Sequence, residues 1–288
     1  MKPLKGFDLL RPRTLVGALE ALNTLELAQP IAGGTDLIPT FRDLGCKPKY
    51  LIDLSLIQEL SGIHEEEGFL NIGATTTHSQ ILSSKLVEEK VKALHEACRW
   101  IGSVQIRNRG TIGGNICNAS PAADTATPLL VHAAEAHIAS LNDTRWIPIQ
   151  DMFAGPKVTV LEPNELLIEL RLPIVNGAGS SFHRIGRRKG FTLSVVNTAA
   201  YLERDSDKVK EIRIALGSIA PTPLTVQRLD EHSGKKMNES FMDKVIEICL
   251  EQIKPIDDVR GTAEYRRDMT LVLVRRALHD AWVRCGGS

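Results

Sequence analysis

The sequence lacks the cysteine and histidine patterns by which many proteins hold metals or activate nucleophiles. Its five cysteines are odd in number and show no Cys-x-x-Cys spacing. This argues against a disulfide framework and against an iron–sulfur or zinc site held by this chain alone. The eight histidines form no His-x-x-x-His or His-Glu-x-x-His motif, and no serine or cysteine stands in a nucleophile motif. We therefore expect buried thiols, and histidines at the surface or satisfied in the core.

An excess of charge of either sign is also missing, as are long hydrophobic runs. Lys and Arg number 35, as do Asp and Glu, which argues against a general affinity for nucleic acid or anionic membranes. No segment is apolar enough for a signal peptide or a membrane span, so we expect a cytoplasmic protein. With 43% hydrophobic residues, the 288-residue chain can bury a substantial core and is long enough for two domains.

The common phosphate-binding signatures are absent as well. A P-loop ends in Gly-Lys-Ser/Thr, whereas Gly234-Lys235 stands in a polar stretch without that ending. A Rossmann fingerprint needs three glycines between a strand and a helix, and Gly177-Ala178-Gly179 lacks the third. Both ATP-type chemistry and a Rossmann nicotinamide site therefore lose support.

Two glycine-rich segments about eighty residues apart are the most informative feature that is present. They are Ala32-Gly33-Gly34-Thr35-Asp36 and Thr111-Ile112-Gly113-Gly114-Asn115. Paired glycines followed by small polar residues can bend the backbone and direct successive N–H groups at one anion. Two such loops together predict a divided cradle for the pyrophosphate of a dinucleotide.

Each of these residues also has a simpler interpretation. The first glycine pair could form a plain β-turn, and Asp36 could cap a short helix that starts after it. Because a carboxylate would be repelled by a pyrophosphate, we expect Asp36 to point away while the N–H groups of Thr35 and Asp36 bind. Thr111 and Asn115 could satisfy groups of their own loop.

Hydrophobic periodicity predicts the elements around these loops. Thr14 can cap a helix with apolar Leu15, Ala18, Leu19 and Leu22, which leads into a short strand before the first glycine pair. Further strands are expected at 50–54, 69–74, 136–140 and 145–149, and a helix at 91–101 with Leu94, Ala97, Cys98 and Ile101 on one face.

Residues 173–180 are the best linker candidate, and the pattern of predicted elements changes after them. Three strands are expected at 182–185, 194–202 and 212–219, followed by helices at 240–254 and 262–283. The last helix carries an apolar stripe, which we expect to pack on the sheet: Val274, Ala277, Leu278, Ala281 and Trp282. Strands followed by helices indicate an α+β C-terminal domain.

The longest informative stretch runs from Gln105 through Ile112-Gly113-Gly114-Asn115 to Asp124. Together with the first glycine segment, 153–156, 165–167, 215–223 and Tyr265-Arg266-Arg267, it resembles the FAD-binding medium subunit of the molybdenum hydroxylases. That family includes xanthine, aldehyde and carbon monoxide dehydrogenases. The resemblance covers nearly the whole chain in order, and the second glycine segment is its specific part.

The resemblance implies an α+β fold: a two-lobed FAD-binding domain of the PCMH, vanillyl-alcohol-oxidase-like type, then a smaller α+β domain of about three antiparallel strands and helices. We expect the first at residues 1–175, with lobes at about 1–55 and 56–175, and the second at 180–286. The resemblance implies no catalytic residue and no metal ligand in this chain. It implies FAD contacts at the following positions: Ile31, Ala32, Gly33, Gly34, Thr35, Asp36, Thr111, Gly114, Asn115, Cys117, Ala123, Asp124, Leu166, Leu167 and His183.

Three of the implied contacts have open alternatives. Asp124 could cap the helix that follows it instead of contacting FAD. His183 stands where many relatives have a basic residue that reaches the flavin, and histidine there puts that contact in question. The basic cluster Arg184, Arg187, Arg188 and Lys189 could lie near the flavin edge or a partner, or form a solvated face.

The resemblance also implies an electron-transfer function. Electrons would come from [2Fe-2S] clusters on a small subunit, fed by a molybdopterin large subunit, and FAD would pass them to NAD+, a quinone or O2. We expect a heterotrimer or a dimer of heterotrimers. The sequence from Asn118 to Asp124 favours xanthine-dehydrogenase-like members of the family. No cysteine-rich insert for an extra cluster is present. The alternatives are a self-sufficient FAD-dependent oxidase and a non-catalytic scaffold or binding subunit.

Overall fold

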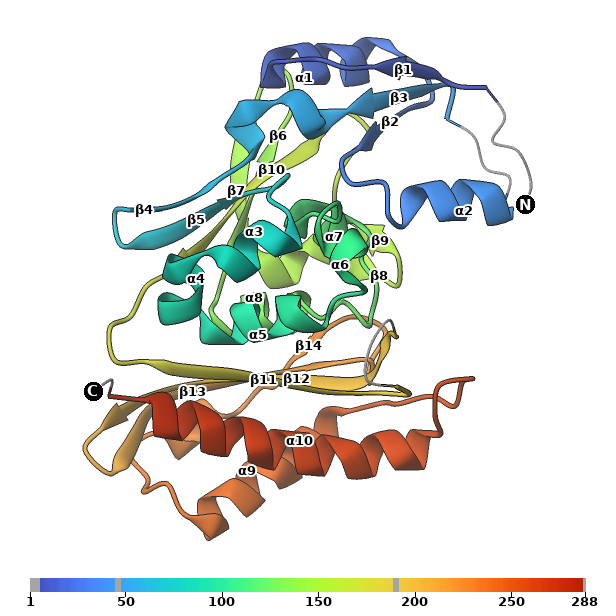
Figure 1. Cartoon of the computed structure of the whole chain (residues 1–288). Coiled ribbons are helices and arrows are strands. Elements are labelled where there is room, and N and C mark those ends of the chain that lie inside the picture. Colours follow the sequence, from blue (N-terminus) through green and yellow to red (C-terminus); the bar gives the residue numbers. More distant parts are fainter. Residues whose placement is uncertain (1–5, 45–47, 189–191, 287–288) are drawn as a thin grey trace.

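Three main sheets lie one below another in the computed structural model, which describes residues 6–44, 48–188 and 192–286 (Figure 1). Their strand orders are β1-β3-β2, β4-β5-β10-β6-β7 and β11-β12-β13-β14. A layer of helices separates the second sheet from the third, and two more helices cover the far face of the third (Figure 1). None of the helices in the described ranges is both long and apolar enough to cross a membrane.

The first sheet is parallel and built from short strands: β1 (Asp8–Leu10), β2 (Ala28–Ile31) and β3 (Tyr50–Asp53). Helix α1 (Leu15–Thr24) begins after Thr14, whose hydroxyl accepts a hydrogen bond from the Gly17 N–H, as the sequence predicts. Its buried face, Ala18, Leu19 and Leu22, also forms one core with Ala139 and Leu166 of the second sheet. The two predicted lobes therefore share apolar contacts.

The second sheet is antiparallel along its whole width. Its strands are β4 (Ile63–Glu66), β5 (Phe69–Gly73), β6 (Glu135–Ala139), β7 (Thr144–Pro148) and β10 (Leu166–Pro173). Periodicity predicted β5, β6 and β7. It missed the edge strand β4, which is mostly exposed, and also β10, the central strand of the sheet. A two-stranded hairpin, β8 (Phe153–Gly155) and β9 (Val158–Thr159), lies to one side.

The helical layer contains mostly short helices. They are α3 (His78–Ser83), α4 (Lys85–Lys90), α5 (Lys92–Trp100), α6 (Val104–Arg107), α7 (Ile112–Cys117) and α8 (Ala126–Val131). Helix α2 (Leu37–Leu44) lies outside this layer, nearer the first sheet (Figure 1). Helix α5 confirms the predicted helix at 91–101, with Leu94, Ala97 and Cys98 fully buried. Ile101 lies beyond its end and is only partly buried. The described residues also contain four short 3-10 helices: Leu54–Leu56, Gln58–Leu60, Ile149–Met152 and Asp230–His232.

The third sheet forms the centre of the C-terminal domain and is antiparallel. It consists of β11 (Gly179–Gly186), β12 (Ser194–Asp205), β13 (Lys208–Gly217) and the two-residue β14 (Leu224–Thr225). Helices α9 (Glu239–Gln252) and α10 (Ala263–Arg284) cover one face, and the predicted stripe of α10 packs there. The α+β class is confirmed, with a fourth strand added to the three expected.

Both faces of this sheet are buried, which fixes the C-terminal domain against the rest of the chain. Phe182, Ala199 and Tyr201 belong to the core that the second sheet shares with the helical layer, whereas Val196 and Ala200 belong to the core under α10. Because side chains alternate along a strand, each strand contributes to both cores. The first ten residues of β12 are buried for this reason.

Candidate cofactor site

The first glycine-rich segment lies against Arg109 and Gly110, the two residues just before the second segment, although more than seventy residues separate them in the sequence. A Cβ atom added at Gly33 would lie 1.9 Å from the carbonyl oxygen of Arg109, and one added at Gly110 would lie 3.4 Å from the hydroxyl of Thr35. The first segment leaves the end of β2, and the second approaches from α6. Glycine at position 33 thus permits the close approach of two backbones that the predicted divided cradle requires.

The first segment offers a row of unpaired donors. Within the described part of the chain, the backbone N–H groups of Gly33, Gly34, Thr35 and Asp36 donate no hydrogen bond to protein. Gly34 has φ of +69°, a left-handed conformation that side chains disfavour. The carbonyls of Gly34 and Asp36 instead accept the first bonds of α2. Consecutive free N–H groups beside a helix start can bind an anion such as a diphosphate.

The second segment does not form the loop that the sequence predicts. Residues 112–117 form helix α7, and Thr111 caps it by accepting the Gly114 N–H at 3.1 Å. Ile112 donates to Thr76 and Gly113 donates to Ala74, at 3.0 and 2.9 Å. These N–H groups are already paired, so the expectation of a second row of free anion donors is wrong. The alternative in which Thr111 satisfies its own loop is confirmed.

The glycines of the second segment serve packing and access. A Cβ atom at Gly113 would lie 2.6 Å from the carbonyl oxygen of Ala74, so this glycine lets α7 lie against the end of β5. Gly114 is exposed, and a Cβ atom there would meet only the Thr111 hydroxyl within 4 Å. The surface over Gly114 is therefore open.

The Asp36 carboxylate forms an ion pair with Lys157. The carboxylate lies 3.6 Å from the Lys157 ammonium, which also donates to the Asn118 side chain at 2.7 Å. Lys157 stands in the turn between β8 and β9, and no pattern around it in the sequence pointed to this role. The lysine offsets a carboxylate that would otherwise repel a diphosphate at the neighbouring N–H groups.

Asp124 is buried in a polar cluster rather than at a helix start. Its carboxylate, 7% exposed, accepts hydrogen bonds from Arg184 at 2.8 Å, from Asn197 at 3.0 Å and from the Ser194 hydroxyl. Burial raises the pKa of Asp124, and the Arg184 charge and these hydrogen bonds oppose that rise. Helix α8 is capped at Thr125 without any side-chain hydrogen bond, so the capping interpretation of Asp124 is wrong.

The donors to Asp124 all come from the C-terminal domain. Arg184 lies on β11 and Ser194 and Asn197 lie on β12, so this cluster joins the two domains. Asn115, the neighbouring predicted contact, accepts a hydrogen bond from Thr125 at 2.6 Å. Sequence reasoning missed these partners because no spacing rule relates residues that only the sheet brings together.

The basic cluster divides between different environments. The Arg184 side chain is 5% exposed and also donates to the carbonyls of Trp100 and Thr192, so it is no part of a solvated face. Arg187 is exposed and donates to the Val259 carbonyl at 3.0 Å. Arg188 is exposed and has an interaction of its own. Lys189 lies outside the described residues.

His183 faces away from the glycine segments. Its ring nitrogen lies 2.9 Å from the Asp280 carboxylate on α10, while the adjacent Phe182 packs in the core between the second and third sheets. Strand alternation places these neighbours on opposite faces of the third sheet. This placement does not favour the predicted flavin contact of the His183 side chain.

The remaining predicted contacts are placed around the same region with different exposure. Leu166 and Leu167 begin β10 with buried side chains that belong to two different cores. Ala123 is buried and Cys117 is half-buried in the core below α7. Ile31 and Ala32 are half-buried at the end of β2.

Three of the four described cysteines are buried thiols, as the sequence predicts, whereas Cys117 is only half-buried. Cys98, Cys249 and Cys285 are buried and unpaired, and burial raises the pKa of Cys249 to about 12. Cys46 lies outside the described residues. Among the residues that the structure covers, no group of three or more His, Cys, Asp or Glu could hold a metal ion.

Comparison with known families accounts for both parts of the chain. Residues 5–175 match the family described as "FAD binding domain in molybdopterin dehydrogenase", and residues 181–281 match "CO dehydrogenase flavoprotein C-terminal domain". These matches define the class of the protein as an FAD-binding flavoprotein of the molybdopterin dehydrogenase type.

Full-length relatives specify the class further. The carbon monoxide dehydrogenase medium chain of Hydrogenophaga pseudoflava is 35% identical, over 97% of this chain and 98% of that protein. The putative xanthine dehydrogenase FAD-binding subunit of Escherichia coli is 30% identical, over 96% of each. A structure of carbon monoxide dehydrogenase from Hydrogenophaga pseudoflava superimposes with a TM-score of 0.95 at 32% identity, covering 99% of this chain and 100% of that one. The chain belongs to the FAD-binding medium subunits of the molybdenum hydroxylase family.

Proposed function

We propose that this chain carries FAD and transfers electrons within a molybdenum hydroxylase complex. Electrons would arrive from [2Fe-2S] clusters on an iron–sulfur small subunit, supplied by a molybdopterin large subunit, and leave to NAD+, a quinone or O2. The observation that carries the proposal is the row of free N–H groups at Gly33 to Asp36, packed against the segment that ends in α7. We propose the domain division between residues 175 and 180.

The residues of this chain would hold the cofactor and leave the chemistry to it. The N–H groups of residues 33–36 would bind the diphosphate, with Lys157 balancing the Asp36 carboxylate 3.6 Å away. The open surface at Gly114 would admit the ligand, and the half-buried Ile31 and Ala32 would lie at its edge. FAD supplies electron storage between one-electron clusters and a two-electron acceptor. No acid or base of this chain takes part.

The substrate would be chosen by the molybdenum partner, because that subunit would bind and oxidise it. Relatives of similar identity are named for carbon monoxide, glyceraldehyde and xanthine dehydrogenases. The sequence from Asn118 to Asp124 makes xanthine-type substrates the first to test, in a cytoplasmic heterotrimer or its dimer.

Steady-state turnover tests this proposal. The isolated chain should bind FAD and allow its reduction by NADH or a chemical reductant, yet oxidise no purine, aldehyde or N-heterocycle. Activity should appear only when an iron–sulfur subunit and a molybdenum subunit are added. Oxidation by the isolated chain at the rate of the full assembly would overturn the proposal in favour of a self-sufficient oxidase. A chain without affinity for FAD would instead indicate a scaffold.

A further inference from the structure

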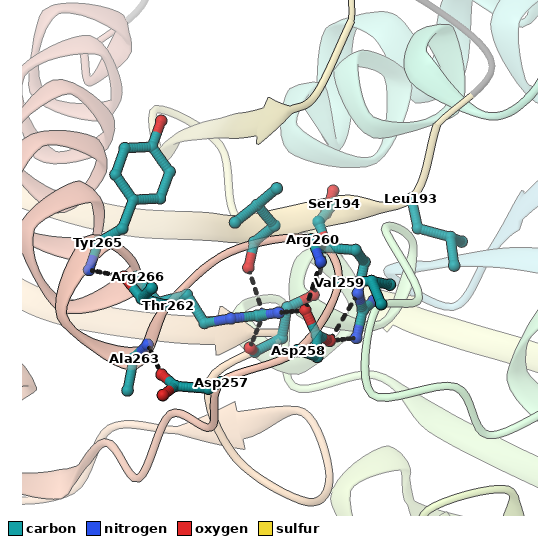
Figure 2. A network of polar contacts seen from close by, with 12 residues as sticks. Leu193, Ser194, Asp257, Asp258, Val259, Arg260, Thr262, Ala263, Tyr265 and Arg266 are labelled. Carbon is teal, nitrogen blue, oxygen red and sulfur yellow. Dashed lines mark hydrogen bonds and ion pairs between the residues drawn. The ribbon is translucent and has the colours of Figure 1, made fainter.

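Arg266, in the first turns of α10, is a fully buried cation far along the sequence from the glycine segments. It is 1% exposed, and its guanidinium donates to the carbonyls of Val195 and Ser218, both at 2.7 Å, and to the Asp258 carboxylate at 2.6 Å (Figure 2). The three acceptors belong to the start of β12, the residue after β13 and the loop before α10. One planar group therefore fixes three segments together.

We expect Arg266 to act mainly by fixing the positions of its acceptors and less by adding to the stability of the fold. A buried ion pair gains little over apolar packing, because desolvation offsets most of the attraction. The fork of Arg266, by contrast, sets the positions of its acceptors. Asp258 is itself held by Arg260, whose side chain donates to it at 2.6 and 2.8 Å. Hydrogen bonds and cations on both sides hold the pKa of Asp258 well below its usual range.

Ser218, one of the acceptors, has a strained backbone that its neighbours hold in place. Its φ is +66°, a left-handed conformation that costs a non-glycine residue energy and persists where the surroundings enforce it. Its carbonyl accepts from Arg266, its hydroxyl donates to the Ser194 carbonyl at 3.0 Å, and its N–H donates to the Pro121 carbonyl at 2.8 Å. The last bond crosses to the FAD-binding domain.

Two chains of contacts lead from Arg266 to the same segment, residues 121–124. One runs through Ser218 to the Pro121 carbonyl. The other runs through Val195 to the adjacent Ser194, whose hydroxyl donates to Asp124. We propose that Arg266 is a positioning residue for the FAD site, which sets the segment 121–124 beside α7 from within the C-terminal domain. This proposal rests on the proposed function.

The test compares two adjacent arginines of α10. Arg266→Lys keeps the charge and loses the fork, whereas Arg267→Lys alters an exposed side chain that bonds only the Leu250 carbonyl. FAD affinity is measured by flavin fluorescence, and visible circular dichroism and the midpoint potential are measured at saturating FAD. We expect Arg266→Lys to weaken FAD binding at least tenfold and to change the dichroism. Arg267→Lys should stay within twofold of the wild type.

Asp258→Asn provides a second variant that keeps both carbonyl contacts, in case Arg266→Lys does not fold. It should weaken FAD binding at least threefold with a change of the same sign in the dichroism. Wild-type affinity, dichroism and potential in a folded Arg266 or Asp258 variant would overturn the inference, even if thermal stability fell. Absence of FAD binding by the wild-type chain would contradict the proposed function instead, so the two failures are distinguishable.

Discussion

Replacing Asp124 by alanine should destabilise the protein through the contact between its two domains. The carboxylate is buried and accepts three hydrogen bonds, all from β11 and β12. Alanine would leave Arg184, 5% exposed, as a buried cation whose carboxylate partner is gone. Removing one partner of a buried pair costs about 3 to 5 kcal/mol. This is a large part of the roughly 5 to 15 kcal/mol by which a typical protein is stable.

A double-mutant cycle with Arg184→Met separates the pair from its surroundings. Each single variant should unfold at lower urea concentration than the wild type. The double variant should lose less free energy of unfolding than the sum of the single losses, with a coupling on the order of 0.5 to 3 kcal/mol. Additive losses, or an Asp124→Ala variant as stable as the wild type, would refute the reasoning.

The same variants decide how Asp124 serves the cofactor. A direct hydrogen bond from the carboxylate to FAD would be lost in Asp124→Ala, at a cost on the order of 1.5 to 3 kcal/mol of binding free energy, but kept in Arg184→Met. FAD titration of both variants gives the answer. Weaker binding in Asp124→Ala alone supports the direct contact, whereas equal weakening in both indicates that the domain contact matters.

Three further substitutions test the site and the buried histidine. In Gly33→Ala, the new Cβ atom would lie 1.9 Å from the Arg109 carbonyl oxygen. The variant should therefore bind FAD at least tenfold more weakly in a titration, and its free energy of unfolding should be lower by about 1 to 3 kcal/mol. Unchanged affinity would contradict the close approach of the two backbones. Gly114→Val should fold, as judged by far-UV circular dichroism, but retain no FAD, and stoichiometric FAD would exclude Gly114 from the site. Burial lowers the pKa of His78 to about 4, so the unfolded state binds its proton first as pH falls from about 6.5. Stability should therefore decrease by roughly 3 kcal/mol toward pH 4, and urea unfolding should show less of this decrease in His78→Gln; identical pH profiles would contradict it.

Local patterns predicted most of the longer helices and strands, because residues within a few positions of one another determine them, but they missed the eight-residue strand β10. The cap at Thr14 and the apolar faces of α1, α5 and α10 follow from residues within a few positions of one another. Short edge elements such as β4 and β14 carry little periodicity, and the sequence did not reveal them.

The sequence identified which residues belong to the candidate site, but it did not show which of them have free N–H groups and which serve packing. The glycine pairs did mark the place where two distant segments meet. Which pair keeps its N–H groups free depends on partners such as Thr76 and Ala74, which only the folded chain brings near α7. The same holds for Asp124 and Arg184, which stand sixty residues apart.

The FAD content of the purified chain tests the central claim most directly. Titration with FAD, followed by removal of unbound ligand and measurement of the flavin absorbance, gives the number of flavins per chain. We predict one FAD per chain, lost in Gly114→Val under the same conditions. A wild-type chain that remains folded but binds no FAD at saturating concentration would contradict the claim that the paired glycine segments form its site.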